Sequence, residues 1–280
     1  MIKRAGVEVM NARSKNVTLA KETIEVTKQK KYLAPSGKEV DISAQVDAAL
    51  SGTVLYKFES ELPDTDLYTT IPIIEVTNET TAQAAIRLSQ QGKQDLVALN
   101  FASARNQGGG FLSGAMAQEE DLCRASALYA CLKTKPIFYN ENILCEDCFY
   151  THNVIYSPKV PFFRDENNLF LEEPFTLSIV SAPAPNLNGS RPEGYQNLTK
   201  GILRERAIRI LDIVACHGHK NIILGAWGCG AFGNDPKMVA EAFQLALQKI
   251  PAFEHVTFAV YDTREPPVLY ETFKEVYHSV

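Results

Sequence analysis

Short runs of consecutive apolar residues constrain the fold of this 280-residue chain more than any other feature of its sequence. These runs are rich in β-branched and aliphatic side chains and have the length of a β-strand. They lack the alternation of apolar and polar residues that marks a strand with one solvated face. We therefore expect interior strands, buried on both faces, at residues 71–76, 96–101, 177–182, 222–225 and 256–261.

Longer segments with apolar residues at helical spacing lie between these runs. They predict helices at residues 80–91, 119–133, 203–216 and 236–249. Gly92 and Gly218 stand where a C-terminal helix cap is expected, and Pro236 stands in a first turn. The alternation of strands and helices over the last two-thirds of the chain predicts an α/β fold, with a central sheet flanked by helices.

The first 60 residues follow a different pattern. An apolar and β-branched segment at 23–27, followed by the turn signal Ala-Pro-Ser-Gly at 34–37, predicts a hairpin, and residues 43–50 predict a short helix. We expect residues 1–60 to form an N-terminal appendage packed on a main domain at residues 61–280, so that the chain is one structural unit.

A segment rich in proline and asparagine lies within the main domain at residues 156–197. Its only expected strand is 177–182. The rest of the segment predicts long loops, which in α/β proteins commonly lie near a functional site.

The slightly acidic composition of the chain argues against some classes of binding partner. The chain has 28 Lys and Arg against 33 Asp and Glu, a formal net charge of −5, which argues against a broad basic face for nucleic acid or anionic lipid. No apolar stretch is long enough to span a membrane, and no signal-peptide run follows the basic residues near the start. We therefore expect a cytoplasmic protein that binds neither DNA nor membranes.

Six cysteines in 280 residues are too sparse for a disulfide scaffold. Cys145 and Cys148 form a lone C-x-x-C with His152 four residues later. A zinc site normally needs a fourth ligand at recognisable spacing, and the sequence offers none. We expect two thiols in a surface loop and no metal site.

A glycine-rich loop follows the expected strand at 96–101. Gly108, Gly109 and Gly110 stand together there, and Gln-Glu-Glu at 118–120 opens the next helix. Three consecutive glycines cost backbone entropy, which we take to exclude a role in core packing. They would instead let main-chain N–H groups approach a ligand closely.

A second glycine-rich loop, at 225–234, lies between another buried strand and a helix and contains G-x-G-x-x-G at 228, 230 and 233. A dinucleotide fold would place an acid at the end of the next strand, but here the nearest acid, Glu254, precedes the last strand. We expect loop N–H groups and the positive end of helix 236–249 to hold a diphosphate. Phe232 would offer an apolar face for a ribose or base.

Glu119 and Glu120 are adjacent, so they point in different directions and cannot flank one bond as an ordinary pair of glycosidase carboxylates does. At most one of them reaches a scissile bond. Acids in a first helical turn also stabilise the helix dipole without any catalytic role. These residues alone leave both interpretations open.

Two stretches together resemble the signature of poly(ADP-ribose) glycohydrolases of the compact microbial type. The first is N-F-A-S-A-R-N-Q-G-G-G-x7-Q-E-E at residues 100–120, and the second is GAWGCGAFGNDP at residues 225–236. The similarity covers the chain from about residue 15 to 275, with shorter matches at 156–161, 181–186 and 261–266. It implies a macrodomain-like fold, with a mixed central sheet between helices.

The resemblance implies an enzyme that hydrolyses ribose–ribose O-glycosidic bonds of poly(ADP-ribose) and releases ADP-ribose. Glu120 would be the catalytic acid and base, and Glu119 would hold a ribose hydroxyl or the neighbouring sugar. A helix N-terminus favours the ionised carboxylate, so burial would have to outweigh the dipole for Glu120 to act as an acid.

The resemblance also implies which other residues contact ADP-ribose. They are Asn106, Gly108, Gly109, Gly110, Gln118, Gly228, Cys229, Gly230, Ala231, Phe232, Gly233, Thr263 and Arg264. Asn106 and the three consecutive glycines would contact the distal ribose and phosphate, and residues 228–233 would wrap the diphosphate. Thr263 and Arg264 would cap the terminal ribose.

The resemblance implies a monomer without metal or cofactor, acting on poly(ADP-ribose) or ADP-ribosylated proteins. The compact chain suggests action at polymer ends. Two alternatives are a non-catalytic macrodomain that reads ADP-ribose and a hydrolase of mono-ADP-ribosyl conjugates. Gln-Glu-Glu argues against a reader, which needs no carboxylate at the anomeric carbon.

Tyr156 and Phe162 either stack on adenine or anchor a buried loop.

Overall fold

A mixed seven-stranded sheet organises the part of the chain that the computed structural model describes, which is residues 2–62, 70–189 and 191–278, with side chains from residue 12 onward. The strand order is β3 (Val54–Tyr56), β6 (Val154–Arg164), β7 (Phe170–Ala182), β5 (Leu96–Phe101), β8 (Asn221–Gly225), β9 (His255–Ala259) and β4 (Ile73–Thr77). The ladders from β7 to β4 are parallel, and β6 runs antiparallel to both of its neighbours. The α/β fold class is confirmed.

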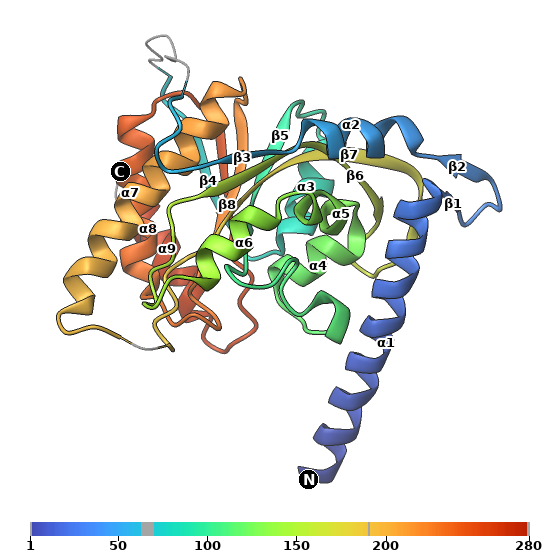
Figure 1. The fold of residues 1–280 in the computed structure, drawn as a ribbon, viewed down its shortest axis with the longest axis horizontal. Coiled ribbons are helices and arrows are strands. Elements are labelled where there is room, and N and C mark those ends of the chain that lie inside the picture. The colour runs from blue at the N-terminus through green and yellow to red at the C-terminus, as the bar shows by residue number, and fades with distance from the viewer. Residues whose placement is uncertain (1, 63–69, 190, 279–280) are drawn as a thin grey trace.

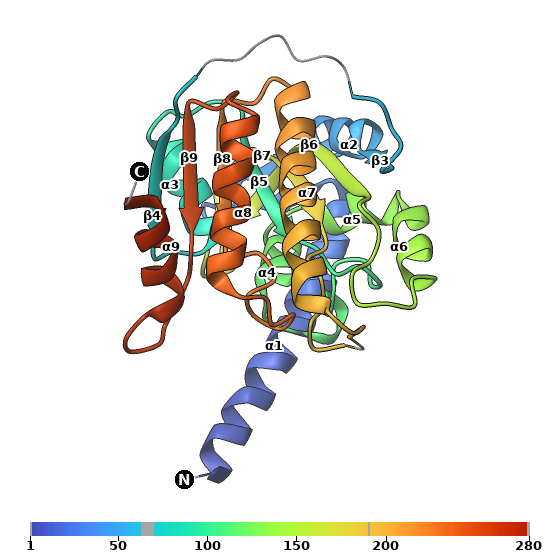
Figure 2. The same ribbon diagram turned by 90° about the vertical axis from the view of Figure 1, so that its left-hand side faces the viewer.

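Helices cover both faces of this sheet (Figure 1). One face packs on α7 (Tyr195–Cys216), α8 (Pro236–Lys249) and α9 (Val268–His278), which lie in front of the strands in Figure 2. The other packs on α1 (Ile2–Gln29), α2 (Ser43–Gly52), α3 (Thr81–Gln90), α4 (Gln118–Ala125) and α5 (Leu128–Lys133). Within β5, Val97 faces the first layer and Ala98 the second, as the twofold period of a strand requires. Among the described residues, no helix is both long and apolar enough to cross a bilayer.

Each of the five expected strands is present, and β5 has the expected bounds. The prediction that all five are interior strands is wrong for β4. Among the described strands it pairs with β9 alone and forms one edge of the sheet, and Ile73 is 67% exposed. A continuous apolar run therefore does not guarantee burial on both faces.

The prediction of a single strand within residues 156–197 is wrong. β6 and β7 form the longest antiparallel ladder of the sheet. Pro158 is compatible with pairing because it stands where the ladder shifts register, between Ser157 and Val160. At such an irregularity a proline removes no regular ladder hydrogen bond.

The single helix expected at 119–133 is interrupted, and it forms α4 and α5 instead. Ser126 adopts an extended backbone and makes an isolated antiparallel bridge to Phe162, while the N–H of Ala127 donates to the Pro161 carbonyl at 3.1 Å. Strand β6 thus pairs with the backbone between the two helices. The predictions for the other helices are confirmed, with α7 longer than expected, and both Gly92 and Gly218 adopt positive φ at helix ends.

The N-terminal residues differ from the expected hairpin. Residues 23–27 belong to α1, and the hairpin strands are β1 (Lys31–Leu33) and β2 (Glu39–Asp41), joined by the expected turn. α2 contains the short helix predicted at 43–50. Side chains of α1 and α2 share one buried cluster with those of α4 and α5. That residues 1–60 form a distinct appendage remains a prediction.

A buried histidine lies where α7 ends beside the amino ends of β5 and β8. The ring of His219 is 5% exposed, with Nδ1 2.7 Å from the Asp95 carbonyl oxygen and Nε2 2.7 Å from the Tyr156 hydroxyl. These contacts fit a neutral ring that donates from Nδ1 and accepts at Nε2. Burial lowers the pKa of His219 and Lys159 adds to this, whereas the hydrogen bond to Asp95 opposes it.

We expect the contribution of His219 to the free energy of unfolding to decrease as the pH falls below about 6.5. The unfolded chain then binds a proton on His219 that the folded chain excludes, so protonation of this residue favours unfolding. Urea unfolding of the wild type and of His219→Gln at pH 7.5 and 5.0 tests this: the wild type should lose more stability, or gain less, than the variant between the two pH values. Equal pH dependence in the two proteins would contradict this role of His219.

Candidate active site

A cavity of about 520 Å³ opens at the carboxyl ends of the parallel strands. This volume suits a small-molecule ligand, and this edge of an α/β sheet is where ligands bind. Its walls come from the start of α3, the end of β5, the start of α4, the loop after β8 and the segment after β9. The charged side chains that line it are Glu79, Glu119, Glu120 and Asp121.

Glu119 is buried at the start of α4, with 3% of its side chain exposed. Its Oε2 accepts from the Ser103 N–H at 2.8 Å, and its Oε1 accepts from the Asn100 Nδ2 at 3.2 Å. Burial raises the pKa of Glu119 to about 8, because it outweighs these two hydrogen bonds, and the neighbouring Glu120 adds to the increase. Both oxygens of Glu119 are thus held by the chain.

Glu120 is held at only one oxygen. Its Oε1 accepts from the Gly110 N–H at 2.7 Å. Its Oε2 is buried and has no hydrogen-bond partner among the described residues, although the side chain lines the cavity. A buried oxygen without a partner is rare in folded proteins. This atom is therefore free to exchange a hydrogen bond or a proton with a ligand.

The glycine-rich loop packs against these two carboxylates. A Cβ on Gly109, whose φ is +59°, would lie 2.4 Å from Glu120 Oε1 and 2.9 Å from Glu119 Oε2. A Cβ on Gly108 would lie 2.9 Å from the Tyr129 ring. The expectation that the consecutive glycines have no packing role is therefore wrong, because they allow the loop to close over the start of α4.

Gln118 lines the cavity, but its side-chain amide bonds to the protein. Its Oε1 accepts from the Phe101 N–H at 2.8 Å, and its Nε2 donates to the Leu99 carbonyl at 2.7 Å and to the Thr81 hydroxyl at 3.1 Å. These bonds fix the start of α4 to the end of β5 and to α3.

The loop after β8 lines the cavity and contains main-chain N–H groups without a partner. Those of Gly228, Gly230, Ala231 and Phe232 make no hydrogen bond within the described structure, and all four residues line the cavity. Trp227 lies beneath them, fully buried, and its Nε1 donates to the Ala182 carbonyl at 3.0 Å. Free N–H groups of consecutive loop residues are a common means of binding a phosphate.

The positive end of α8 contributes less to this site than expected. Asp235 is the N-cap residue, and its carboxylate accepts from the Met238 N–H at 2.9 Å. A negative charge already present at the helix N-terminus partly neutralises the dipole and uses one of its free donors. The free donors near the cavity are therefore those of the loop.

Other residues expected at the site do not line this cavity. They are Asn106, Gly108, Gly109, Gly110, Cys229, Gly233, Thr263 and Arg264. Asn106 is exposed, and its N–H donates to the Ser103 hydroxyl at 3.1 Å. Arg264 forms an ion pair with Asp262, with Nε 2.7 Å from Oδ1.

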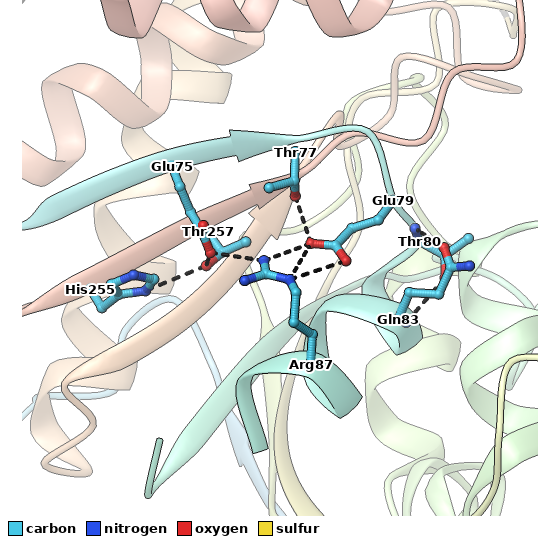
Figure 3. A network of polar contacts seen from close by, with 8 residues as sticks. All are labelled: Glu75, Thr77, Glu79, Thr80, Gln83, Arg87, His255 and Thr257. Carbon is cyan, nitrogen blue, oxygen red and sulfur yellow. Dashed lines mark hydrogen bonds and ion pairs between the residues drawn. The ribbon is translucent and has the colours of Figure 1, made fainter. Parts of the chain in front are cut away.

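Residues 79–82, at the start of α3, also line the cavity and were not among the expected site residues. Figure 3 shows Glu79 pointing toward Arg87, whose Nη2 lies 2.7 Å from Glu79 Oε1 and 2.9 Å from Glu75 Oε1. The Thr77 hydroxyl donates to Glu79 Oε1 at 2.8 Å. A capping box of Thr80 and Gln83, readable as T-x-x-Q after a strand, was the available signal.

The two aromatic residues considered for adenine stacking are buried in strand β6, so they belong to the sheet and not to a loop. Tyr156 stacks on the His217 ring with centroids 3.6 Å apart, and Phe162 stacks on Phe175 at 5.2 Å. Tyr261 lines the cavity and is 58% exposed, so it is the aromatic residue after β9 that a ligand can reach.

None of the six cysteines forms a disulfide in the described structure. Within residues 2–62, 70–189 and 191–278, no three His, Cys, Asp or Glu side chains are grouped so that they could hold a metal ion.

A family model and several solved structures are similar to this chain. The model of the microbial-type PARG catalytic domain matches residues 20–165. A poly(ADP-ribose) glycohydrolase of Thermomonospora curvata, solved with the inhibitor ADP-HPD, is 40% identical, with a TM-score of 0.84 over 94% of this chain and 99% of that one. The enzyme of Deinococcus radiodurans, solved with ADP-ribose, is 40% identical, with a TM-score of 0.76 over 86% of this chain and 100% of that one. A search of curated proteins finds no match.

We expect Gly109→Ala to displace the two carboxylates. Alanine at positive φ costs about 1–2 kcal/mol, and the contact with Glu120 should add about 1–3 kcal/mol of overpacking. Gly92→Ala is the matched control, because Gly92 has a φ of +79° and open space at its Cβ. Urea unfolding of both variants measures the difference. A Gly109→Ala variant no less stable than Gly92→Ala would contradict the tight contact.

Proposed function

Because the chain belongs to the microbial-type poly(ADP-ribose) glycohydrolase family, we propose that it hydrolyses the ribose–ribose O-glycosidic bonds of poly(ADP-ribose) and releases ADP-ribose. The observation that carries this proposal is that Glu120, whose Oε2 is buried without a partner among the described residues, lines the same cavity as loop residues whose N–H groups make no hydrogen bond there. The first suits acid–base chemistry at an acetal, and the second suits a diphosphate.

Glu120 acts as both acid and base. It gives a proton to the departing ribose oxygen as the bond from that oxygen to the distal ribose C1 breaks, and the bonding electrons leave with the oxygen. Water then attacks C1 and returns a proton to the Glu120 carboxylate. Glu119 is less suited to this cycle, since Asn100 and the Ser103 N–H already hold its two oxygens. It contacts a ribose hydroxyl or the neighbouring sugar.

The diphosphate lies against the N–H groups of Gly228, Gly230, Ala231 and Phe232. Because the charged side chains lining the cavity are acidic, these neutral donors are the groups available to bind phosphate there. Phe232 lies beside the distal ribose and offers an apolar face.

The remaining contacts surround this core. Asn106 and the glycines at 108–110 lie near the distal ribose and phosphate, and the diphosphate loop extends through Cys229 to Gly233. Thr263 and Arg264 cap the terminal ribose. Gln118 acts indirectly by holding α4 in place.

The enzyme acts in the cytoplasm as a monomer on poly(ADP-ribose) or ADP-ribosylated proteins, and it processes chain ends. It uses neither metal nor cofactor, because acetal hydrolysis requires only a proton donor and an activated water. A non-catalytic ADP-ribose reader is the less favoured function. Such a protein gains nothing from a buried carboxylate oxygen without a partner, which costs free energy.

We expect Glu120→Gln to release ADP-ribose from purified poly(ADP-ribose) about 10²–10⁴-fold more slowly than the wild type, the usual effect of losing a general acid. Its ADP-ribose affinity by calorimetry should stay within about threefold, because a glutamine oxygen can still accept from the Gly110 N–H. Glu166→Gln, in the exposed β6–β7 turn, is the control.

The same assay on end-labelled polymer reports the order of products, and ADP-ribose should appear before internal fragments. A wild type that binds ADP-ribose but releases none from the polymer would make this protein a reader. A fully active Glu120→Gln would remove Glu120 from the chemistry.

A further inference from the structure

The loop at residues 226–234 rests on the segment at 182–188, which follows β7. Two contacts come from side chains of the loop: Trp227 to the Ala182 carbonyl, and Asn234 to the Pro185 carbonyl at 2.8 Å. Two others reach the tip of the loop from the supporting segment. The Leu187 N–H donates to the Phe232 carbonyl at 2.8 Å, and the Asn188 Nδ2 donates to the Ala231 carbonyl at 2.7 Å.

The contact from Asn188 determines the direction of one N–H group. In a trans peptide the carbonyl of one residue and the N–H of the next point in opposite directions. The peptide between Ala231 and Phe232 is trans, so holding the Ala231 carbonyl toward Asn188 turns the Phe232 N–H to the opposite face of the loop. That N–H has no partner in the described structure, and Phe232 lines the cavity.

Residues 230–233 form a turn closed by the Gly233 N–H, which donates to the Gly230 carbonyl at 3.0 Å, and the peptide held by Asn188 is the central peptide of this turn. A Cβ on Gly230 would meet nothing within 4 Å, and Gly230 and Ala231 are both exposed. Asn188 closes over the other side of the tip, where a Cβ on Gly233 would lie 3.1 Å from its Oδ1. Asn188 is itself held by Asn186, whose Oδ1 accepts the Asn188 N–H at 3.3 Å.

We propose that Asn188 is a positioning residue for diphosphate binding: its side-chain amide holds the Ala231 carbonyl away from the ligand and thereby aims the Phe232 N–H at a phosphate oxygen. This inference rests on the proposed function for the identity of the ligand. The role requires a donor at this position, and a side chain that only fills the space would not perform it.

The test compares Asn188→Ala and Asn188→Asp, with Asn167→Ala as a control, since Asn167 is an exposed asparagine in the β6–β7 turn. Calorimetry with ADP-ribose should show Kd raised about 5- to 10-fold by Asn188→Ala, the effect of one hydrogen bond. Asn188→Asp should bind more weakly still, because a carboxylate cannot donate and repels the Ala231 carbonyl. On poly(ADP-ribose), KM should rise in parallel while kcat at saturation stays unchanged.

Asn188 is exposed, so both variants should fold, and their melting temperatures check this. Affinity equal to wild type in both variants would overturn the proposal. So would an aspartate variant that binds as the wild type does while the alanine variant does not, because space filling would then be sufficient. A fall in kcat at unchanged KM would also overturn it. The calorimetric comparison stands even if the wild type binds ADP-ribose without hydrolysing polymer, whereas a wild type that does not bind ADP-ribose overturns both proposals.

Discussion

The contact between Gly109 and the carboxylates of Glu119 and Glu120 is the constraint on which the rest of the site depends. It requires a residue without a side chain at positive φ, so that the loop after β5 can close over the first turn of α4. Closure buries both carboxylates and brings the Gly110 N–H to Glu120. One oxygen of Glu120 is thereby fixed, and the other is buried without a hydrogen-bond partner among the described residues, in a residue that lines the cavity. A single acid–base group needs such an arrangement.

The fold supports this contact from several directions. Gln118 ties the start of α4 to the end of β5, and Asn100 joins Glu119 to Ser181 on the adjacent strand β7. The loop after β8 is built differently. The N–H groups at its tip have no partner in the described structure, and the segment at 182–188 holds carbonyl groups of the tip through Leu187 and Asn188. The acid–base group thus comes from the first turn of α4, and the N–H groups for a phosphate come from the loop after β8. The parallel strands β5 and β8 bring the two glycine-rich loops to the same edge of the sheet.

The parts of the fold that depend on local pattern could be predicted from the sequence. The apolar run of β5 predicts both ends of this strand to the residue. The helical period and the proline of α8 do the same for that helix. Both glycine-rich loops were also predicted. Features set by distant partners could not be predicted. Ser126 interrupts a helical pattern because strand β6 pairs with it, and the roles of Glu79 and Asn188 depend on Arg87 and Ala231, which sequence spacing does not reveal. The packing role of Gly109 likewise depends on a tertiary contact, because it arises where the loop meets Glu119 and Glu120 of α4.

A crystal structure with ADP-ribose bound would show whether Glu120 and the loop after β8 act on one ligand. The diphosphate should lie against the N–H groups of residues 228 and 230–232. The C1 of the distal ribose should lie beside Glu120, with Oε2 within hydrogen-bonding distance of the hydroxyl that replaces the scissile oxygen. Gly109 should keep its place against both carboxylates. A ligand bound with its diphosphate away from this loop, or with the distal ribose out of reach of Glu120, would contradict the account.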